Sequence, residues 1–279
     1  MARGSDWNAE ELALTVESYL HMLRSELRGD PYVKRRENER LQEAIRRSAS
    51  AIEMKHMNIS AVLIGLGAQP IRGYKPLPNA QGALREAVTA YWEKHPDLEA
   101  LMRLTTSQPP GAADFHWQLV DAPGFKLDET TTTPRSRNPV KTDFVQLEAE
   151  NRRLGLEGER AVVELERQRL RRLGRVALAD KVEHVSQTQG DGLGYDVLSF
   201  EESGKPKLIE VKTTRQLKEF PFLLTRNEVA LSGEVPDQFH LYRLFNYGHK
   251  PSSYYALRGD LTSTCLLDAV TYQARPRAS

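Results

Sequence analysis

The chain has 279 residues, a formal net charge of +1 and a single cysteine, Cys265. One cysteine excludes an internal disulfide framework and a multi-cysteine zinc site, and it favours a reducing cytoplasm. The balanced charge confines any DNA-binding surface to a local patch, and the length suffices for two domains. No apolar run is long enough to span a bilayer and no export signal is visible, so we expect a cytoplasmic protein that has no membrane contact.

The first hundred residues carry helical patterns. Asn8 and Glu11 fit a capping box, and apolar residues at helical spacing follow, which predicts a helix over 8–27. Further helices are expected over 34–47 and 50–66, with Gly67 as the left-handed stop. A fourth helix opens at Asn79, and a short fifth begins at Pro96. These patterns predict an all-α head that covers residues 1–104.

The third helix and the loop after it hold polar residues that we interpret as a DNA-recognition surface. Ile52, Ile59 and Val62 face the expected core, which leaves the polar side chains of this helix on the outside. The candidate contacts are Lys55, His56, Asn58, Arg72, Tyr74 and Lys75. A solvated polar face, dimerisation, or packing of the head against the second domain are the competing explanations.

A Pro- and Thr-rich stretch follows, with Pro109-Pro110-Gly111 and four consecutive threonines from Thr130. Such a composition does not build a packed core, so residues 105–142 are predicted to be a linker. Phe115, Trp117, Leu119 and Val120 lie inside it and are expected to dock on a domain.

Residues 143–279 alternate between helical and strand patterns. A long helix is expected over 151–173, followed by a hairpin of Tyr195–Phe200 and Lys207–Thr213 that turns at Ser203-Gly204. Further strands are expected over 220–224, 239–246 and 254–257, and Thr225 and Glu228 form a capping box that starts a short helix. The fold class is therefore α+β, with an all-α N-terminal module followed by an α/β domain that has a mixed central sheet.

The hairpin brings an acidic cluster together. Asp196 lies beside Glu210, and the period of two places Glu210 and Lys212 on one face of their strand, opposite Ile209 and Val211. Two carboxylates suit Mg²⁺, for which Mn²⁺ can substitute, and the ion activates a water molecule as a nucleophile. Lys212 orients that water or neutralises the phosphorane. The pattern indicates a metal-dependent nuclease; the alternative is an ordinary cross-strand salt bridge on a solvated face.

Asp196 followed by Glu210-x-Lys212 resembles the PD-(D/E)XK superfamily. More narrowly, residues 155–247 resemble the C-terminal domain family of the protein NO VEIN, through Gly-Leu-Glu-Gly-Glu-Arg-Ala-Val (155–162), Gly-Asp-Gly-Leu-Gly-Tyr-Asp (190–196), Ile-Glu-Val-Lys-Thr-Thr (209–214) and Leu-Thr-Arg-Asn-Glu (224–228). The resemblance implies a restriction-endonuclease-like fold and adds Glu159 as a further catalytic acid. It departs from the superfamily pattern at Tyr195, where proline is usual. The helical head is similar to modules that precede this domain in bacterial proteins.

Further candidate DNA contacts surround the acidic cluster: Gln189, Thr213, Arg215 and Arg226. Gly190, Gly192 and Gly194 bracket Asp191 in a loop that permits close backbone approach. This loop lacks the Gly-Lys-Ser/Thr ending of a phosphate loop, so no nucleotide triphosphate site is expected.

Together these features predict a bacterial Mg²⁺-dependent DNA endonuclease that acts in defence or restriction. Its catalytic residues are Glu159, Asp196, Glu210 and Lys212, and Asp196 and Glu210 hold the metal. Two alternatives stay open: an inactive nuclease fold that binds DNA or a partner, and a repair or mobile-element nuclease. DNA is the expected partner, and a homodimer is left open.

Overall fold

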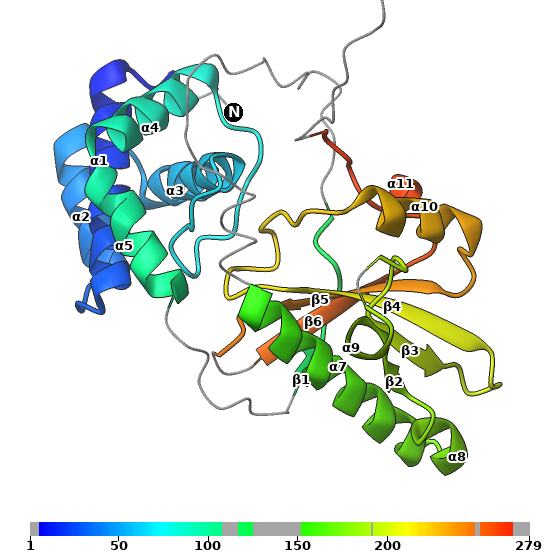
Figure 1. Cartoon of the computed structure of the whole chain (residues 1–279). Helices are drawn as coiled ribbons and strands as arrows, with labels where there is room; N and C mark the ends of the chain where they lie inside the picture. The colour runs from blue at the N-terminus through cyan, green and yellow to red at the C-terminus, as the bar shows by residue number, and fades with distance from the viewer. Residues whose placement is uncertain (1–5, 108–116, 125–151, 191, 249–251, 270–279) are drawn as a thin grey trace, which may run out of the picture. The chain divides into compact units, whose positions relative to one another are not determined.

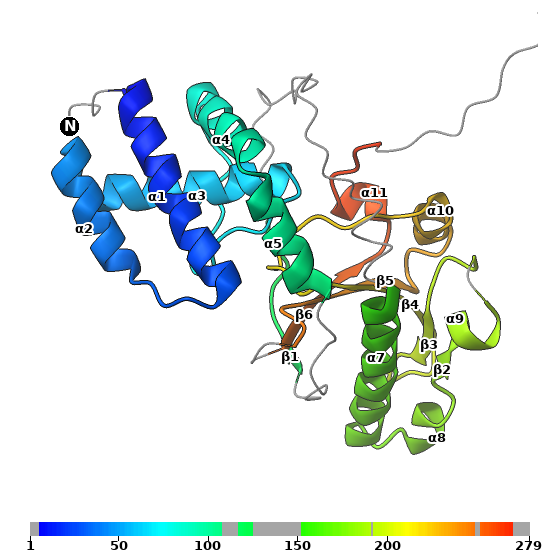
Figure 2. The ribbon, with the colours of Figure 1, turned by 60° about the vertical axis from the view of Figure 1, so that its left-hand side comes forward.

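The computed structural model describes residues 6–107, 117–124, 152–190, 192–248 and 252–269. They separate into two compact units, one helical and one built around a β-sheet (Figures 1 and 2). Most of the segment expected to be a linker, including Phe115, lies outside the described residues, as does Asp191.

The described part of the helical unit includes the helices α1 (Ala9–Arg28), α2 (Lys34–Ile45), α3 (Ala49–Gly65), α4 (Gly82–Lys94) and α5 (Pro96–Ser107). The capping box of α1 is confirmed, because Asn8 Oδ1 accepts the Glu11 N–H at 2.9 Å and Glu11 Oε2 accepts the Asn8 N–H at 2.8 Å. Gly67 has the left-handed φ of 72° expected after α3. The predicted helices are confirmed within two or three residues at each end.

The core of this unit packs α1, α3 and α4 together. Tyr19 is fully buried, and its hydroxyl pairs with Ser60 Oγ at 2.7 Å and accepts the Ile71 N–H at 2.9 Å. Paired in this way, the buried hydroxyl avoids the desolvation cost of an unsatisfied polar group. The other large buried members are Leu12, Leu20, Met22, Leu23, Ile59, Leu63, Ile71, Leu84 and Leu98.

The second unit is a six-stranded mixed sheet with the order β1-β6-β5-β4-β3-β2. Its strands are β1 (Trp117–Leu119), β2 (Glu183–His184), β3 (Val197–Phe200), β4 (Pro206–Thr213), β5 (Phe239–Phe245) and β6 (Ser252–Arg258). β3 and β4 form the predicted antiparallel hairpin, and β4 pairs with β5 in parallel. β1 runs parallel to β6 at the edge.

Helices cover both faces of this sheet (Figures 1 and 2). α7 (Arg152–Arg172) lies on one face, and α10 (Arg226–Glu234) and α11 (Leu261–Thr264) lie on the other; α8 (Val176–Ala179) and α9 (Val185–Thr188) are short. Ile209 and Val211 point toward α7 and are buried with Ala161 and Val162. This confirms the predicted core face of β4.

A buried polar network fastens α7 to the sheet. Glu166 on α7 is fully buried and accepts hydrogen bonds from Ser199 Oγ at 2.6 Å and Tyr242 Oη at 3.0 Å. Arg169 and Lys207 supply the opposite charges at 2.8 and 3.5 Å. Because these partners come from α7, β3, β4 and β5, the network fixes the helix that carries Glu159.

Two strand assignments need correction. The strand expected over 220–224 is absent, because this described segment has no ladder partner and Pro221 lacks an N–H to donate. Conversely, Trp117–Leu119, within the segment expected to be a linker, form β1 by pairing with Ser252–Tyr254. In the described ranges, no helix combines the length and apolar character needed to cross a bilayer.

Candidate active site

Asp196 precedes β3 and is tied to β4 through backbone and side chain. Its N–H donates to the Ile209 carbonyl at 2.9 Å, and its Oδ2 accepts the Val211 N–H at 2.8 Å. Val211 lies between Glu210 and Lys212, so this contact holds the aspartate beside both. The predicted convergence of Asp196, Glu210 and Lys212 is therefore present in the structure.

Lys212 lies between two carboxylates. Its Nζ is 2.9 Å from Glu210 Oε1 and 3.1 Å from Oε2 of Glu228, which belongs to the first turn of α10. Glu210 is 4% exposed and Glu228 is 8% exposed. The alternative of a salt bridge on a solvated face is contradicted, because α10 covers this face of β4.

Burial and like charge dominate the electrostatics of the carboxylates. Burial and the charge of Glu159 raise the pKa of Asp196 to about 7. Burial and the neighbouring Asp196 raise the pKa of Glu210 well above its ordinary value. Burial lowers the pKa of Lys212, but Glu210 and Glu228 more than offset it, so its pKa is raised. The site therefore keeps one protonated ammonium beside carboxylates that lack enough positive charge.

Glu159 approaches the cluster from α7. Its Oε2 accepts a hydrogen bond from Ser186 Oγ at 2.6 Å and lies 2.7 Å from His184 Nε2. Neither His184 nor Ser186 was a candidate from the sequence, since neither lies in a motif and both reach Glu159 only through the fold. Glu228 was predicted as a capping residue alone, and the tertiary structure adds its contact with Lys212.

The donor set fits a divalent cation. Besides burial, Glu159 raises the pKa of Asp196 and Asp196 raises the pKa of Glu210, which is the response of buried carboxylates that lack enough positive charge. Mg²⁺ requires only one or two protein carboxylates and retains water in its other positions. Across the described part of the chain, no three His, Cys, Asp or Glu side chains converge as a metal-ligand group. A site built by Asp196 and Glu210 therefore leaves most of the coordination to water.

The candidate DNA contacts near the cluster differ in position. Arg226 is exposed at the start of α10, and Gln189 is exposed with its amide donating to Glu183 at 3.3 Å. Arg215 is half-buried just after β4. The expectation for Thr213 was wrong, since its hydroxyl is buried against Gly158 of α7. Thr213 is an odd-numbered residue of β4 and so faces α7 with Val211.

The predicted recognition surface of the head is largely interior. Lys55, His56, Asn58 and Tyr74 are all buried, and Lys55 Nζ donates to Gln81 Oε1 at 2.9 Å. Asn58 Nδ2 donates to the Leu77 carbonyl at 2.8 Å. The expectation of an exposed polar face failed because the chain after α3 folds back over that face.

The His56 ring packs against the rings of Tyr19 and Tyr74, with centroid distances of 5.6 and 4.9 Å. Burial, with a smaller effect of Lys34, lowers its pKa to about 4. Of the predicted head contacts, Arg72 and Lys75 are exposed.

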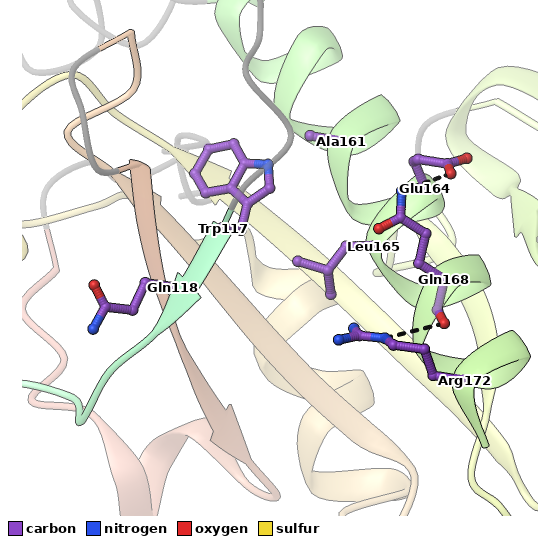
Figure 3. A pocket seen from close by; sticks show the side chains of 7 residues that line it. All are labelled: Trp117, Gln118, Ala161, Glu164, Leu165, Gln168 and Arg172. Atoms are coloured by element: carbon purple, nitrogen blue, oxygen red, sulfur yellow. Dashed lines mark hydrogen bonds between the residues drawn. The ribbon is translucent and has the colours of Figure 1, made fainter.

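A separate hollow of about 350 Å³ lies between β1 and α7 (Figure 3). Leu165 and Trp117 form its apolar side, and Gln118, Gln168 and Arg172 bring polar groups to it. None of the residues of the acidic cluster lines it. It is therefore distinct from the candidate active site.

Comparison with known proteins adds one match. The comparisons with curated proteins and with solved structures each gave no match. Residues 158–256 match the family described as Protein NO VEIN, C-terminal. The matched range contains Glu159, Asp196, Glu210, Lys212 and Glu228. The C-terminal part of the chain thus resembles the protein NO VEIN C-terminal family.

Proposed function

We propose that the sheet-containing unit is a Mg²⁺-dependent endonuclease that hydrolyses phosphodiester bonds in DNA. The observation that carries the proposal is the convergence of Asp196, Glu210 and Lys212, with two carboxylates buried together beside a single ammonium. Such a buried cluster is costly for folding alone, because like charges repel in a low-dielectric environment. A divalent cation supplies the positive charge that these carboxylates lack.

Each residue has a distinct task. Asp196 and Glu210 hold the ion, and the Val211 N–H fixes the aspartate while the β4 backbone fixes the glutamate. A bound Mg²⁺ supplies Lewis-acid activation of water and neutralises phosphate charge. Lys212 presents a positive charge to the phosphate as negative charge develops on it. Glu159, oriented by His184 and Ser186, places a further acceptor beside Asp196.

DNA as the substrate and bacterial defence or restriction as the setting are the finer parts of the proposal. They are supported by the resemblance of the matched region and by the exposed cations Arg226, Arg72 and Lys75. Neutralised phosphates release counterions, so binding by the full chain should weaken steeply with salt. Arg72→Ala or Lys75→Ala should flatten that dependence by about one unit per lost phosphate contact. An unchanged salt slope in both variants would contradict a DNA-binding role of the helical unit.

The substrate is tested with purified full chain and Mg²⁺ or Mn²⁺. Unmodified plasmid, modified phage DNA, single-stranded DNA and branched DNA are incubated in parallel, with EDTA as the control. Cleavage of plasmid or phage DNA favours restriction, whereas cleavage confined to branched DNA favours a repair or mobile-element nuclease. Absence of metal-dependent cleavage on all four would contradict the enzyme proposal.

A non-catalytic binding platform is the second candidate. In its favour, no group of three potential metal ligands occurs among the described residues, and Lys212 is paired on both sides. This candidate predicts DNA binding that is indifferent to Mg²⁺ and to Glu210→Gln. The nuclease proposal predicts that DNA cleavage requires Mg²⁺ and is lost in Glu210→Gln.

A further inference from the structure

Glu228 makes two kinds of contact at the start of α10. Its Oε2 accepts the Thr225 N–H at 3.1 Å, and its own N–H donates to Thr225 Oγ1 at 3.3 Å. The same Oε2 lies 3.1 Å from Lys212 Nζ. A capping box works with Gln as well as Glu at this position, so the cap does not require the negative charge. The charge serves Lys212.

The position of Lys212 depends on how its two carboxylates are engaged. Glu210 pairs with Lys212 and is also a proposed ligand of the divalent ion. A bound ion therefore weakens the attraction between Glu210 and the Lys212 ammonium. Glu228 is not one of the proposed metal ligands and keeps its full charge for Lys212. A buried ammonium without a fixed partner moves toward solvent, because burial of an unpaired charge is costly.

We infer that Glu228 is a positioning residue that holds the Lys212 ammonium in the site while a divalent ion occupies Asp196 and Glu210. This inference rests on the proposed function and adds a member to its machinery. Glu228 acts through Lys212. The same helical turn presents Arg226 to solvent, so one rigid element carries the lysine anchor and an exposed cation.

Two variants of the full chain separate the charge of Glu228 from its capping role. Glu228→Gln retains an oxygen for the Thr225 N–H and loses the charge that faces Lys212. Thr225→Ala loses the hydroxyl that caps the helix and keeps the pair between Glu228 and Lys212. A structural role in capping alone predicts a stronger effect of Thr225→Ala, and the positioning role predicts the reverse.

The first measurement follows the reaction of Lys212 with an amine-acylating reagent, quantified by peptide mass spectrometry in saturating Mg²⁺ without DNA. We expect acylation about tenfold faster in Glu228→Gln than in wild type, since a contact with a charged group is worth at least that factor. Thr225→Ala should react like wild type. Glu228→Asp, which keeps a carboxylate, should fall between wild type and Glu228→Gln, and it serves if the glutamine variant fails to fold.

The second measurement is DNA cleavage. Glu228→Gln should lower kcat by about tenfold to a hundredfold with little change in KM, because a small displacement at the reacting centre costs up to that factor. Thr225→Ala should leave kcat unchanged. Wild-type acylation and kcat in Glu228→Gln, or equal effects of both variants, would overturn the inference. If wild type cleaves no DNA, the proposed function fails, and the acylation comparison still decides whether Glu228 holds Lys212.

Discussion

The carboxylate of Asp196 is fastened to the backbone of Val211, with Oδ2 accepting the N–H at 2.8 Å. Val211 itself points into the core against α7. The aspartate is therefore held by β4. The two neighbours of Val211 on this strand, Glu210 and Lys212, point to the opposite face and belong to the same site. Such an arrangement orders the ligands before an ion arrives and concentrates negative charge in the buried site.

The ion-free protein should become more stable when a carboxylate of the cluster is neutralised. Glu210→Gln and Asp196→Asn each remove a charge that burial and a neighbouring carboxylate disfavour. Each should raise the free energy of unfolding of the ion-free protein by roughly 1–4 kcal/mol, the repulsion of two close like charges in partly screened surroundings. Denaturant unfolding in EDTA measures this, with added Mg²⁺ as the matched condition. Destabilisation by both variants in EDTA would show that the cluster is an ordinary stabilising ion-pair network.

Lys212→Met should lower the free energy of unfolding of the ion-free protein. The substitution keeps most of the side-chain volume but leaves Glu210 and Glu228 without their shared cation. Loss of one partner of a buried ion pair costs about 3–5 kcal/mol. The same denaturant titration in EDTA measures the loss, and a variant as stable as wild type would mean that the ammonium is dispensable for the fold.

Gly158 sets the distance between α7 and β4. A Cβ on this residue would lie 1.8 Å from Thr213 Oγ1 and 2.9 Å from Thr213 Cβ. Gly158→Ala should therefore destabilise the unit by about 1–3 kcal/mol, despite the better helix propensity of alanine. The displaced helix carries Glu159, so activity should fall as well.

The matched control for Gly158→Ala is the double variant with Thr213→Ala, which removes the nearest hydroxyl. Thermal unfolding should show that the double variant recovers part of the loss. Simple addition of the two single effects would argue against direct contact.

The helical unit should lose stability in mild acid because of His56. Its folded-state pKa of about 4 lies below the ordinary value of 6.5, so the unfolded chain binds the proton more strongly. The contribution of His56 is intact above pH 6.5 and is lost as the pH falls from there toward 4, by roughly 3 kcal/mol. His56→Phe keeps a ring against Tyr19 and Tyr74 and does not titrate. The stability difference between wild type and this variant should shift with pH over that range, and a constant difference would contradict a neutral buried imidazole.

Features set by local chemistry were predictable. The capping boxes at Asn8 and Thr225 and the turn at Gly204 depend on residues a few positions apart, and all three occur in the structure. The pair of Glu210 and Lys212 follows from strand periodicity, and its nearness to Asp196 from one hairpin. The sequence pattern was therefore sufficient to predict that Asp196, Glu210 and Lys212 lie together.

What depends on tertiary packing was not predictable. α3 is buried on nearly all sides, and its polar residues Lys55 and Asn58 find partners in the segment that folds back over it. A polar residue on a helix does not reveal whether water or another segment covers it. Likewise, Glu228 meets Lys212 only because α10 packs over β4, and His184 meets Glu159 only because β2 lies beside α7.

The most direct test of the account is cleavage of supercoiled plasmid DNA by purified full chain, compared with Glu210→Gln purified in the same way. We expect nicked and linear products from wild type in Mg²⁺ or Mn²⁺, none in EDTA, and a rate at least about a hundredfold lower for Glu210→Gln. Equal cleavage by the two proteins would assign the activity to a contaminant. Absence of cleavage by wild type with either ion would contradict the assignment of Asp196, Glu210 and Lys212 to catalysis.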